Sequence, residues 1–509
     1  MTESQSESHR KLFAATDTQS LFLGVIASLA VMLPWIWSPS LNLEYVFLQG
    51  AHSLIAPSAE SPIADYFAKQ ANPLGMSLLA GVATRALSIL PELTSSRLPN
   101  VIGLTSIVYL GWLGLRRSNS VLSRFLLWSS FIALNPIVLP YAVRLSADVL
   151  PAALVFASFT VTKQVVDGCR ESRLWLAPLL IFFAAMLKYN SLYFLFGVTA
   201  LLVSNNVTEG LRFNKRKLPA VVGGTALGAL TFALFVTWQY RISGILLLNN
   251  EFRSIHSLRL DDPLTLSSRG FRYLAFLSLL MSPMLAGRIS STVLPLRKLA
   301  VSILIGVPTF FLARLDDPTG GELDFGGLIP RGSWLDQLLI LLGCILTPLL
   351  VWSILRVSRR KDAVLLLAYV VVPLVVMSFA RPAQRYLIPI VVIVSFVLAS
   401  ATVPKAPALL AQSFAIVLMT IPCFALVGYQ NGTAVAADRM AQWIQDRQLL
   451  EVTRPDDIQP HAGQYWVDVK SDEPQFKVTK LNSQAQCQLH ETPISLFGVT
   501  IGKYCLKQV

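Results

Sequence analysis

Acidic residues that suit general-base chemistry occur in one long stretch near the start of the chain. Glu44 closely follows the first apolar run, and Asp65 lies in the same stretch, which covers residues 39–96. A carboxylate held between a helix and the bilayer can have its pKa raised by burial, as a general base requires. Glu44 can equally cap a surface helix, and this stretch alone gives the two interpretations similar weight.

A single lysine interrupts the apolar stretch from Leu174 to Val203. Both ends of this stretch are basic, so it must form a hairpin that returns to the same side. Each arm of about 14 residues is about 21 Å long at the helical rise, which is shorter than a hydrocarbon core of about 30 Å. The apex with Lys188 is therefore expected below the outer surface, where a lysine needs an anionic partner or a water-filled cavity.

The composition is that of a polytopic membrane protein. Of the 509 residues, 54% are hydrophobic and 14% are charged, whereas soluble domains carry about 25% charged residues. Apolar runs of about 20 residues recur, which is the length needed to cross a bilayer as a helix. The net charge of +13 is assigned to loops that face anionic lipid headgroups. Membrane lipids are thus expected partners, and nucleic acid is not.

Seven short Lys/Arg-rich stretches predict the topology, because basic loops stay on the cytoplasmic side. They favour about thirteen membrane segments, with the N-terminus in the cytoplasm and the C-terminus outside. The segments are expected at residues 20–38, 97–115, 122–142, 149–165, 174–187, 190–203, 218–240, 272–287, 299–313, 336–354, 363–380, 386–403 and 407–427.

This topology divides the chain into three parts. Residues 1–19 form a cytoplasmic N-terminus, residues 20–427 a transmembrane domain, and residues 428–509 a small α+β domain on the outer face. The first outer loop, 39–96, is expected to contain juxtamembrane helices, because Arg85 interrupts its apolar stretch 73–90. In the tail, a polar helix is expected at residues 434–448. A disulfide between Cys487 and Cys505 is favoured over two free thiols.

Three short motifs resemble those of a known enzyme superfamily. They are Leu43-Glu44-x-x-Phe47, Asn72-Pro73-Leu74 and Arg97-Leu98-Pro99. The polyprenyl-phosphate-sugar glycosyltransferases of the GT-C superfamily have a similar order of an Asp-Glu-x-x-Tyr-like motif, Pro-Pro-Leu and Arg-Leu-Pro. Protein O-mannosyltransferases and lipid A aminoarabinose transferases are examples. Leu43 stands in the place of the family's first acid, which leaves Glu44 as the only carboxylate; a slip of one residue would put Glu44 at the catalytic position.

The resemblance continues later in the chain. The segment from Arg144 to Asp148 is similar to the family's second outer loop, which carries an Arg and then an Asp at a helix start. Asp148 can cap that helix or assist catalysis, and capping is favoured. The apex with Lys188 resembles the family's short hairpin, and the segment from Arg381 through Arg385 to Pro389 resembles an Arg-Tyr-x-x-Pro segment.

The resemblance implies an all-α, GT-C-like enzyme of the bacterial inner or plasma membrane. Such an enzyme transfers a sugar, with inversion, from a polyprenyl-phosphate donor to a glycan, lipid or protein acceptor outside the cytoplasm. The catalytic carboxylates would be Glu44, Asp148 and Asp65. The leaving phosphate needs cations as its bond to the sugar breaks, and the expected cations are Lys188, Arg381, Arg385 and Arg144.

Other features of the outer loops have simpler interpretations. Five arginines crowd one loop, and for most of them interfacial contact with lipid phosphates is favoured. They are Arg241, Arg253, Arg259, Arg269 and Arg272. The acids at 316, 317, 322 and 324 are suitable ligands for a divalent cation, but a solvated loop is favoured, and no metal site is assigned.

Two other classes of membrane protein also contain many helices. A lipid-linked oligosaccharide polymerase or ligase has a long outer loop late in the chain, whereas here the longest internal loop comes first. A transporter is disfavoured because the sequence has no inverted repeat and no paired broken helices.

Overall fold

The computed structural model describes most of the helical part of the chain and short strands in the tail. The described ranges are 3–38, 44–55, 72–116, 121–167, 173–204, 217–248, 262–289, 296–314, 329, 332–357, 360–380, 382–400, 406–446, 452–453, 476–480, 489–490, 494–496, 499–501 and 504–508.

The protein is a helical membrane protein. Within the described residues, 6 helices are long and apolar enough to cross a bilayer. They are α1 (Glu3–Ile36), α5 (Glu92–Leu115), α8 (Val149–Val166), α11 (Leu218–Ser243), α16 (Trp334–Val357) and α20 (Ala406–Asp446). Many of their apolar side chains are exposed, for example Leu230 and Leu234 on α11. Exposed apolar surface on a long helix is what contact with lipid requires.

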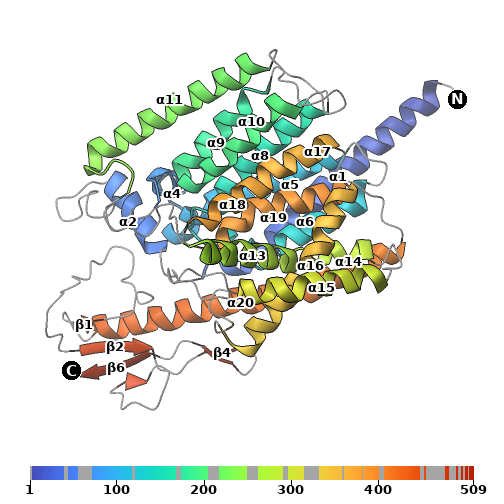
Figure 1. The fold of residues 1–509 in the computed structure, drawn as a ribbon. Helices are drawn as coiled ribbons and strands as arrows, with labels where there is room; N and C mark the ends of the chain where they lie inside the picture. Colours follow the sequence, from blue (N-terminus) through green and yellow to red (C-terminus); the bar gives the residue numbers. More distant parts are fainter. Residues whose placement is uncertain are drawn as a thin grey trace.

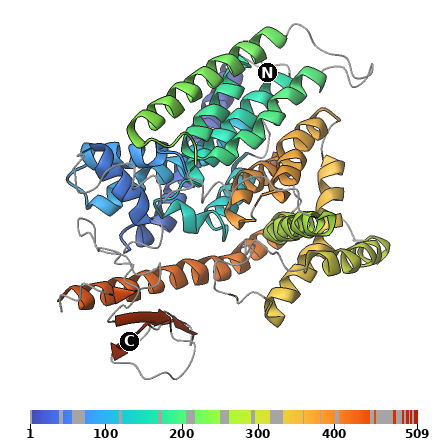
Figure 2. The same ribbon diagram turned by 60° about the vertical axis from the view of Figure 1, so that its left-hand side comes forward.

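Shorter helices complete the bundle (Figures 1 and 2). They are α6 (Val121–Ala133), α7 (Leu139–Ala142), α9 (Leu176–Leu187), α10 (Leu195–Ser204), α13 (Pro263–Leu280), α14 (Ser282–Ile289), α15 (Leu296–Ala313), α17 (Arg360–Leu366), α18 (Val372–Ser378) and α19 (Ile388–Ser400). The 3₁₀ helices are η2 (Tyr189–Phe194) and η4 (Gln384–Leu387), and η3 (Leu367–Val371) is a π-helix. Every predicted membrane segment overlaps a helix, while the number of true spans stays a prediction.

The predicted short hairpin is present. Helix α9 ends at Leu187, Lys188 is extended (φ −156°, ψ 114°), and η2 leads directly into α10. Lys188 is buried, as the length of the arms indicates. Helix α4 packs closely against this apex through Gly75 at its start. A Cβ on Gly75 would lie 2.3 Å from the backbone oxygen of Met186, so a larger residue would not fit there.

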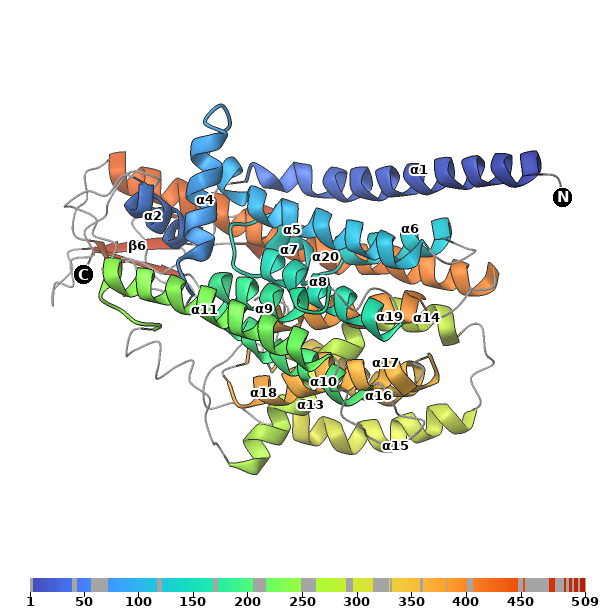
Figure 3. The same cartoon turned by 90° about the horizontal axis from the view of Figure 1, so that it is seen from above.

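Two helices of the first predicted outer loop lie at one end of the bundle. They are α2 (Glu44–Ile55) and α4 (Gly75–Ala86). Figure 3 shows α4 running across the direction of α1 and α5, with its C-terminal tip beyond the bundle. This is the orientation expected of a helix that lies along a membrane surface. The strands of the tail lie at the same end, which we call the sheet end.

The last expected membrane segment and the polar helix expected after it form one continuous helix. One helix, α20, runs for 41 residues from Ala406 to Asp446, through the predicted domain boundary at residue 428 (Figure 1). Gly428 and Gly432 lie inside it. A glycine inside a helix costs only about 1 kcal/mol relative to alanine. The alanine-rich sequence after Gly432 favours helix and offsets that cost.

The tail after α20 contributes short strands. Strands β1 (Val452–Thr453), β2 (Phe476–Lys480), β6 (Tyr504–Gln508) and β3 (Leu489–His490) form one sheet in that order, with β1 parallel to β2 and the other pairs antiparallel. A second pair joins β4 (Ile494–Leu496) to β5 (Val499–Ile501). Cys505 lies in β6, but Cys487 lies outside the described residues, so the disulfide stays a prediction.

Close packing between α5 and α8 fixes the frame of the site. A Cβ on Gly103 of α5 would lie 2.8 Å from the Cα of Leu150, so only glycine allows this approach. The side chain of Asn100, one turn earlier on α5, accepts a hydrogen bond from Leu150 N (3.2 Å). It also donates to the backbone oxygens of Arg144 (2.7 Å) and Ser146 (2.8 Å). The segment that enters α8 is therefore held against α5.

Candidate active site

Glu44 is the centre of a buried ion cluster at the sheet end. Arg97 of α5 binds its carboxylate with two hydrogen bonds, Nε to Oε1 and Nη2 to Oε2, each 2.8 Å long. Arg144, in the segment before α8, lies 3.2 Å from Oε2. The backbone N–H of Leu145 donates to Oε1 at 2.6 Å. Glu44 is 3% exposed and Arg97 is not exposed at all.

This cluster joins several elements. Nη1 of Arg97 also donates to the backbone oxygens of Ile36 and Ser38, each at 2.7 Å, at the end of α1. Arg144 donates to the side-chain oxygen of Asn431 on α20. Glu44 and its two arginines thus connect α1, α2, α5, α20 and the segment before α8.

The surroundings of Glu44 make it a weak base. Burial by itself would raise the pKa of Glu44, but the charges of Arg97 and Arg144 and the hydrogen bonds from Arg97 and Leu145 hold that pKa below its ordinary value. Both carboxylate oxygens already accept hydrogen bonds. A base for an alcohol needs a raised pKa and an accessible oxygen, and this geometry offers neither.

Asp148 does not cap its helix. It occupies the N-cap position of α8, but its side chain makes no capping hydrogen bond, so the favoured interpretation of Asp148 is wrong. Its Oδ1 instead forms an ion pair with Nζ of Lys188 at the hairpin apex. Both side chains are largely buried. A buried ammonium and a buried carboxylate each stabilise the charged form of the other, and this preference overrides the capping tendency.

The apex lysine faces a late segment of the chain. Nζ of Lys188 lies 4.7 Å from the centre of the Tyr386 ring, a cation–π contact. Arg385, the preceding residue, is near enough for its charge to act on Lys188. The backbone N–H of Ala383 donates to the hydroxyl of Tyr273 on α13 at 3.0 Å. Lys188 thus pairs with Asp148 and is within electrostatic reach of Arg385, which comes from an element far away in sequence.

Two further arginines come from α13, and the sequence had grouped them with the arginines expected to contact lipid phosphates. Arg269 and Arg272 are buried; Arg269 donates to the backbone oxygen of Ser378 at 3.3 Å, and Arg272 lies 3.5 Å from Asp336 on α16. Contact with lipid phosphates does not apply to buried side chains. The spacing of Arg269, Arg272 and Tyr273 on one helix face was the available signal.

Several predicted residues lie outside the described part of the chain. They are Asp65, Arg253, Arg259, Arg381 and the acids at 316, 317, 322 and 324. Among the described residues, no group of three His, Cys, Asp or Glu side chains is arranged to hold a metal ion.

Comparisons with known proteins add one structural similarity. No protein-family model matches the chain, and no curated protein does. Among solved structures, the chain is similar to the crystal structure of ArnT from Cupriavidus metallidurans in the apo state, with a TM-score of 0.43 and 14% sequence identity. The similarity covers 87% of this chain and 84% of that one. A similarity of this size does not establish a common function.

Proposed function

We propose that the protein is a GT-C-type membrane glycosyltransferase that uses a polyprenyl-phosphate-linked sugar. The observation that carries the proposal is the buried pair of Lys188 and Asp148, with Arg385 and Tyr386 beside it. It combines cations suited to a phosphate with a carboxylate suited to a hydroxyl. It also lies at the end of a membrane bundle, where the phosphate of a lipid-linked donor would be.

The cations of the site suit the departure of a phosphate. When the bond between the sugar and the phosphate breaks, negative charge develops on the phosphate oxygens, and fixed cations in a dry site stabilise it. Lys188 and Arg385 already lie within electrostatic reach of each other, so donor binding has to exchange only Asp148 for the phosphate. Arg269, which donates to the backbone oxygen of Ser378 just before this segment, is a further buried cation. Arg381, four residues before Arg385, remains a further proposed cation.

Donor binding would also prepare the base. In the structure described here, Lys188 neutralises Asp148. A donor phosphate competes with Asp148 for Lys188, and the released carboxylate can then accept the proton of an acceptor hydroxyl. That hydroxyl oxygen forms a bond to the anomeric carbon as the carbon–oxygen bond to the phosphate breaks on the opposite face. The anomeric carbon is inverted, and the phosphate leaves on its lipid.

Glu44 and Arg144 take a positioning role in this proposal. Their contacts fix the side chain of Arg144 and the backbone of Leu145, and Asp148 follows three residues after Leu145 in the same segment. Asp65 remains the alternative base. The proposed acceptor is a glycan, a lipid or a protein on the outer face of the bacterial inner or plasma membrane, with the sheet end outside and the N-terminus in the cytoplasm.

The test measures donor binding and transfer separately. Asp148→Asn should reduce turnover by about 10²-fold or more, the usual contribution of a general base, while equilibrium binding of the donor is kept or tightened because Lys188 loses its competitor. Lys188→Met should weaken donor binding by roughly tenfold or more, the effect of one charge-assisted hydrogen bond. Asp167→Asn is the control, because Asp167 pairs with Lys163 (3.3 Å) on the surface at the other end of α8.

Two results would overturn parts of this proposal. Transfer by Asp148→Asn at the wild-type rate would remove Asp148 as the base and leave Asp65 in that role. If the wild-type protein in lipid neither hydrolyses nor transfers from any polyprenyl-phosphate sugar, the proposed function itself is wrong.

A further inference from the structure

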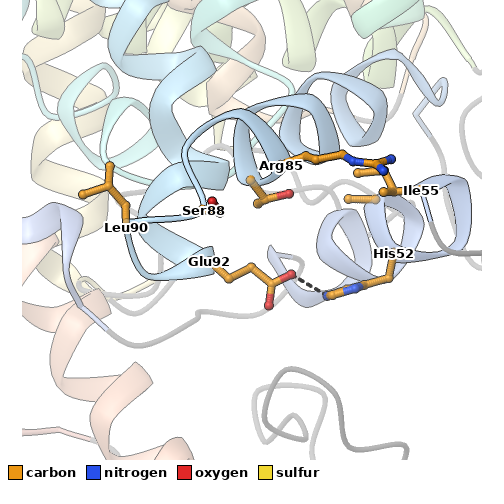
Figure 4. A pocket seen from close by; sticks show the side chains of 8 residues that line it. His52, Ile55, Arg85, Ser88, Leu90 and Glu92 are labelled. Atoms are coloured by element: carbon orange, nitrogen blue, oxygen red, sulfur yellow. Dashed lines mark ion pairs between the residues drawn. The ribbon is translucent and has the colours of Figure 1, made fainter.

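A separate pocket lies between α2, α4 and the start of α5. It has a volume of about 420 Å³, and its lining combines polar and apolar side chains. Figure 4 shows His52 and Ile55 from α2 on one side, Arg85 from α4 across the top, and Glu92 at the start of α5 below. Pockets of 300–1,000 Å³, in round terms, commonly hold small ligands, so this one has room for a polar headgroup.

The charges of the pocket are of both signs. Nε2 of His52 lies 2.5 Å from Oε1 of Glu92, and both side chains are partly exposed, at 43% and 36%. Across the pocket, Arg85 is exposed, and no carboxylate among the described residues pairs with it. One wall therefore presents a guanidinium and the other an accessible carboxylate.

The pocket opens beside an apolar tip. Val82, Leu87 and Ile89 at the end of α4 are exposed, Ile89 at 92%. Helix α4 crosses the direction of the spanning helices, and its tip points away from the bundle (Figure 3). An exposed apolar tip on such a helix is stable in the interface of a bilayer, which places the adjoining pocket among lipid headgroups.

We propose that this pocket binds the headgroup of a membrane lipid that carries both a phosphate and a primary amine, of the phosphoethanolamine type. The phosphate would meet Arg85, and the amine would donate to the carboxylate of Glu92. A headgroup with only negative charge brings no cation to Glu92, and a choline headgroup has no N–H to donate to it. The charges on the two walls thus select a zwitterion with hydrogen-bond donors.

This site is distinct from the candidate active site. The start of α4 contacts the hairpin near Lys188 through Gly75 and Met186. Arg85 lies ten residues further along α4, which corresponds to about 15 Å at the helical rise. Lipid binding and sugar transfer can therefore be measured separately. A negative result for lipid binding would not affect the proposed transferase activity, and the reverse also holds.

The test uses the full chain in nanodiscs that contain equal amounts of phosphatidylethanolamine, phosphatidylcholine and phosphatidylglycerol. Lipids that stay bound after mild detergent extraction are identified by native mass spectrometry. We expect phosphatidylethanolamine to be retained over the other two by roughly tenfold, the effect of one charge-assisted hydrogen bond. Glu92→Gln should abolish the preference over phosphatidylglycerol, and Arg85→Gln should remove retention of all three.

The matched control is Arg241→Gln, which removes another exposed arginine, in the last turn of α11. This variant should retain phosphatidylethanolamine as the wild-type protein does. Equal retention of the three lipids by the wild-type protein overturns the proposal, as does preferential retention of phosphatidylglycerol. An unchanged preference in both Arg85→Gln and Glu92→Gln would show that the lipid binds elsewhere.

Discussion

The substitution Glu44→Gln separates the two roles that Glu44 can have. Glutamine has nearly the same shape as glutamate, so the change removes the negative charge and leaves most of the packing intact. If Glu44 is the base, the folded variant is stable and slow. If Glu44 holds the ion cluster together, the variant is unstable, because Arg97 and Arg144 keep their charges in a buried site without the carboxylate that neutralises them.

The structure gives the expected size of the stability loss. The Glu44 carboxylate accepts two hydrogen bonds from Arg97 and one each from Arg144 and the backbone of Leu145. Removing one partner of a buried ion pair typically costs about 3–5 kcal/mol. The glutamine oxygen can still accept a hydrogen bond, and Arg97 keeps its bonds to Ile36 and Ser38. We therefore expect a loss near the lower end, about 3 kcal/mol.

The assay compares unfolding and turnover in the same preparations. Thermal unfolding in detergent, followed by tryptophan fluorescence, should show a clear decrease for Glu44→Gln. Asp167→Asn is the control, because partly exposed i,i+4 pairs contribute only about 0.3–0.5 kcal/mol. Turnover is then measured per folded molecule. A Glu44→Gln variant as stable as wild type, but about 10²-fold slower, would refute this reasoning and return the role of base to Glu44.

Three further predictions address other parts of the molecule. The hydrogen bond to Glu92 raises the pKa of His52, so the stability that this pair contributes is full below the unfolded pKa of about 6.5 and is lost as the pH rises through the folded pKa; Glu92→Gln should flatten this dependence in thermal unfolding scans. Gly75→Ala should destabilise the fold and reduce turnover, because its Cβ would lie 2.3 Å from a backbone oxygen, whereas Gly223→Ala on α11 has open space around it and should be neutral or stabilising. Mass spectrometry of the non-reduced protein should show the two cysteines of the tail joined, and free thiols at both positions would contradict this.

The helical architecture and the unusual hairpin were predictable from local sequence. Each membrane segment predicted from a run of apolar residues overlaps a helix of the structure. The basic ends and the short arms around Lys188 predicted a buried lysine with an anionic partner, and the structure supplies Asp148. These inferences depend on the length of a helix and the thickness of a bilayer, which act on nearby residues.

The partners of the charged residues were not predictable in the same way. Glu44 lies 53 residues from Arg97 and 100 from Arg144, and no local pattern relates them. In the sequence alone Glu44 is an isolated acid, for which base and cap are the natural interpretations. The sequence predicts a loop around Arg269 and Arg272 because the expected membrane segment begins at residue 272, whereas α13 begins at Pro263. The first turns of α13 carry polar side chains that are buried against other helices of the protein. A hydropathy scale, which detects only apolar runs, does not recognise such a helix start.

The described geometry explains how one short segment can serve two clusters. Arg144 is fixed by Glu44 and by Asn431 of α20, and its backbone oxygen accepts from Asn100 of α5. Asp148, four residues later, is held toward Lys188. In the proposed mechanism Asp148 first loses its ion pair with Lys188 and then accepts a proton. Its backbone must stay in place when Lys188 moves away. The buried ion cluster provides that fixed backbone, so its charges serve preorganisation of the site even though they take no part in the proposed proton transfer.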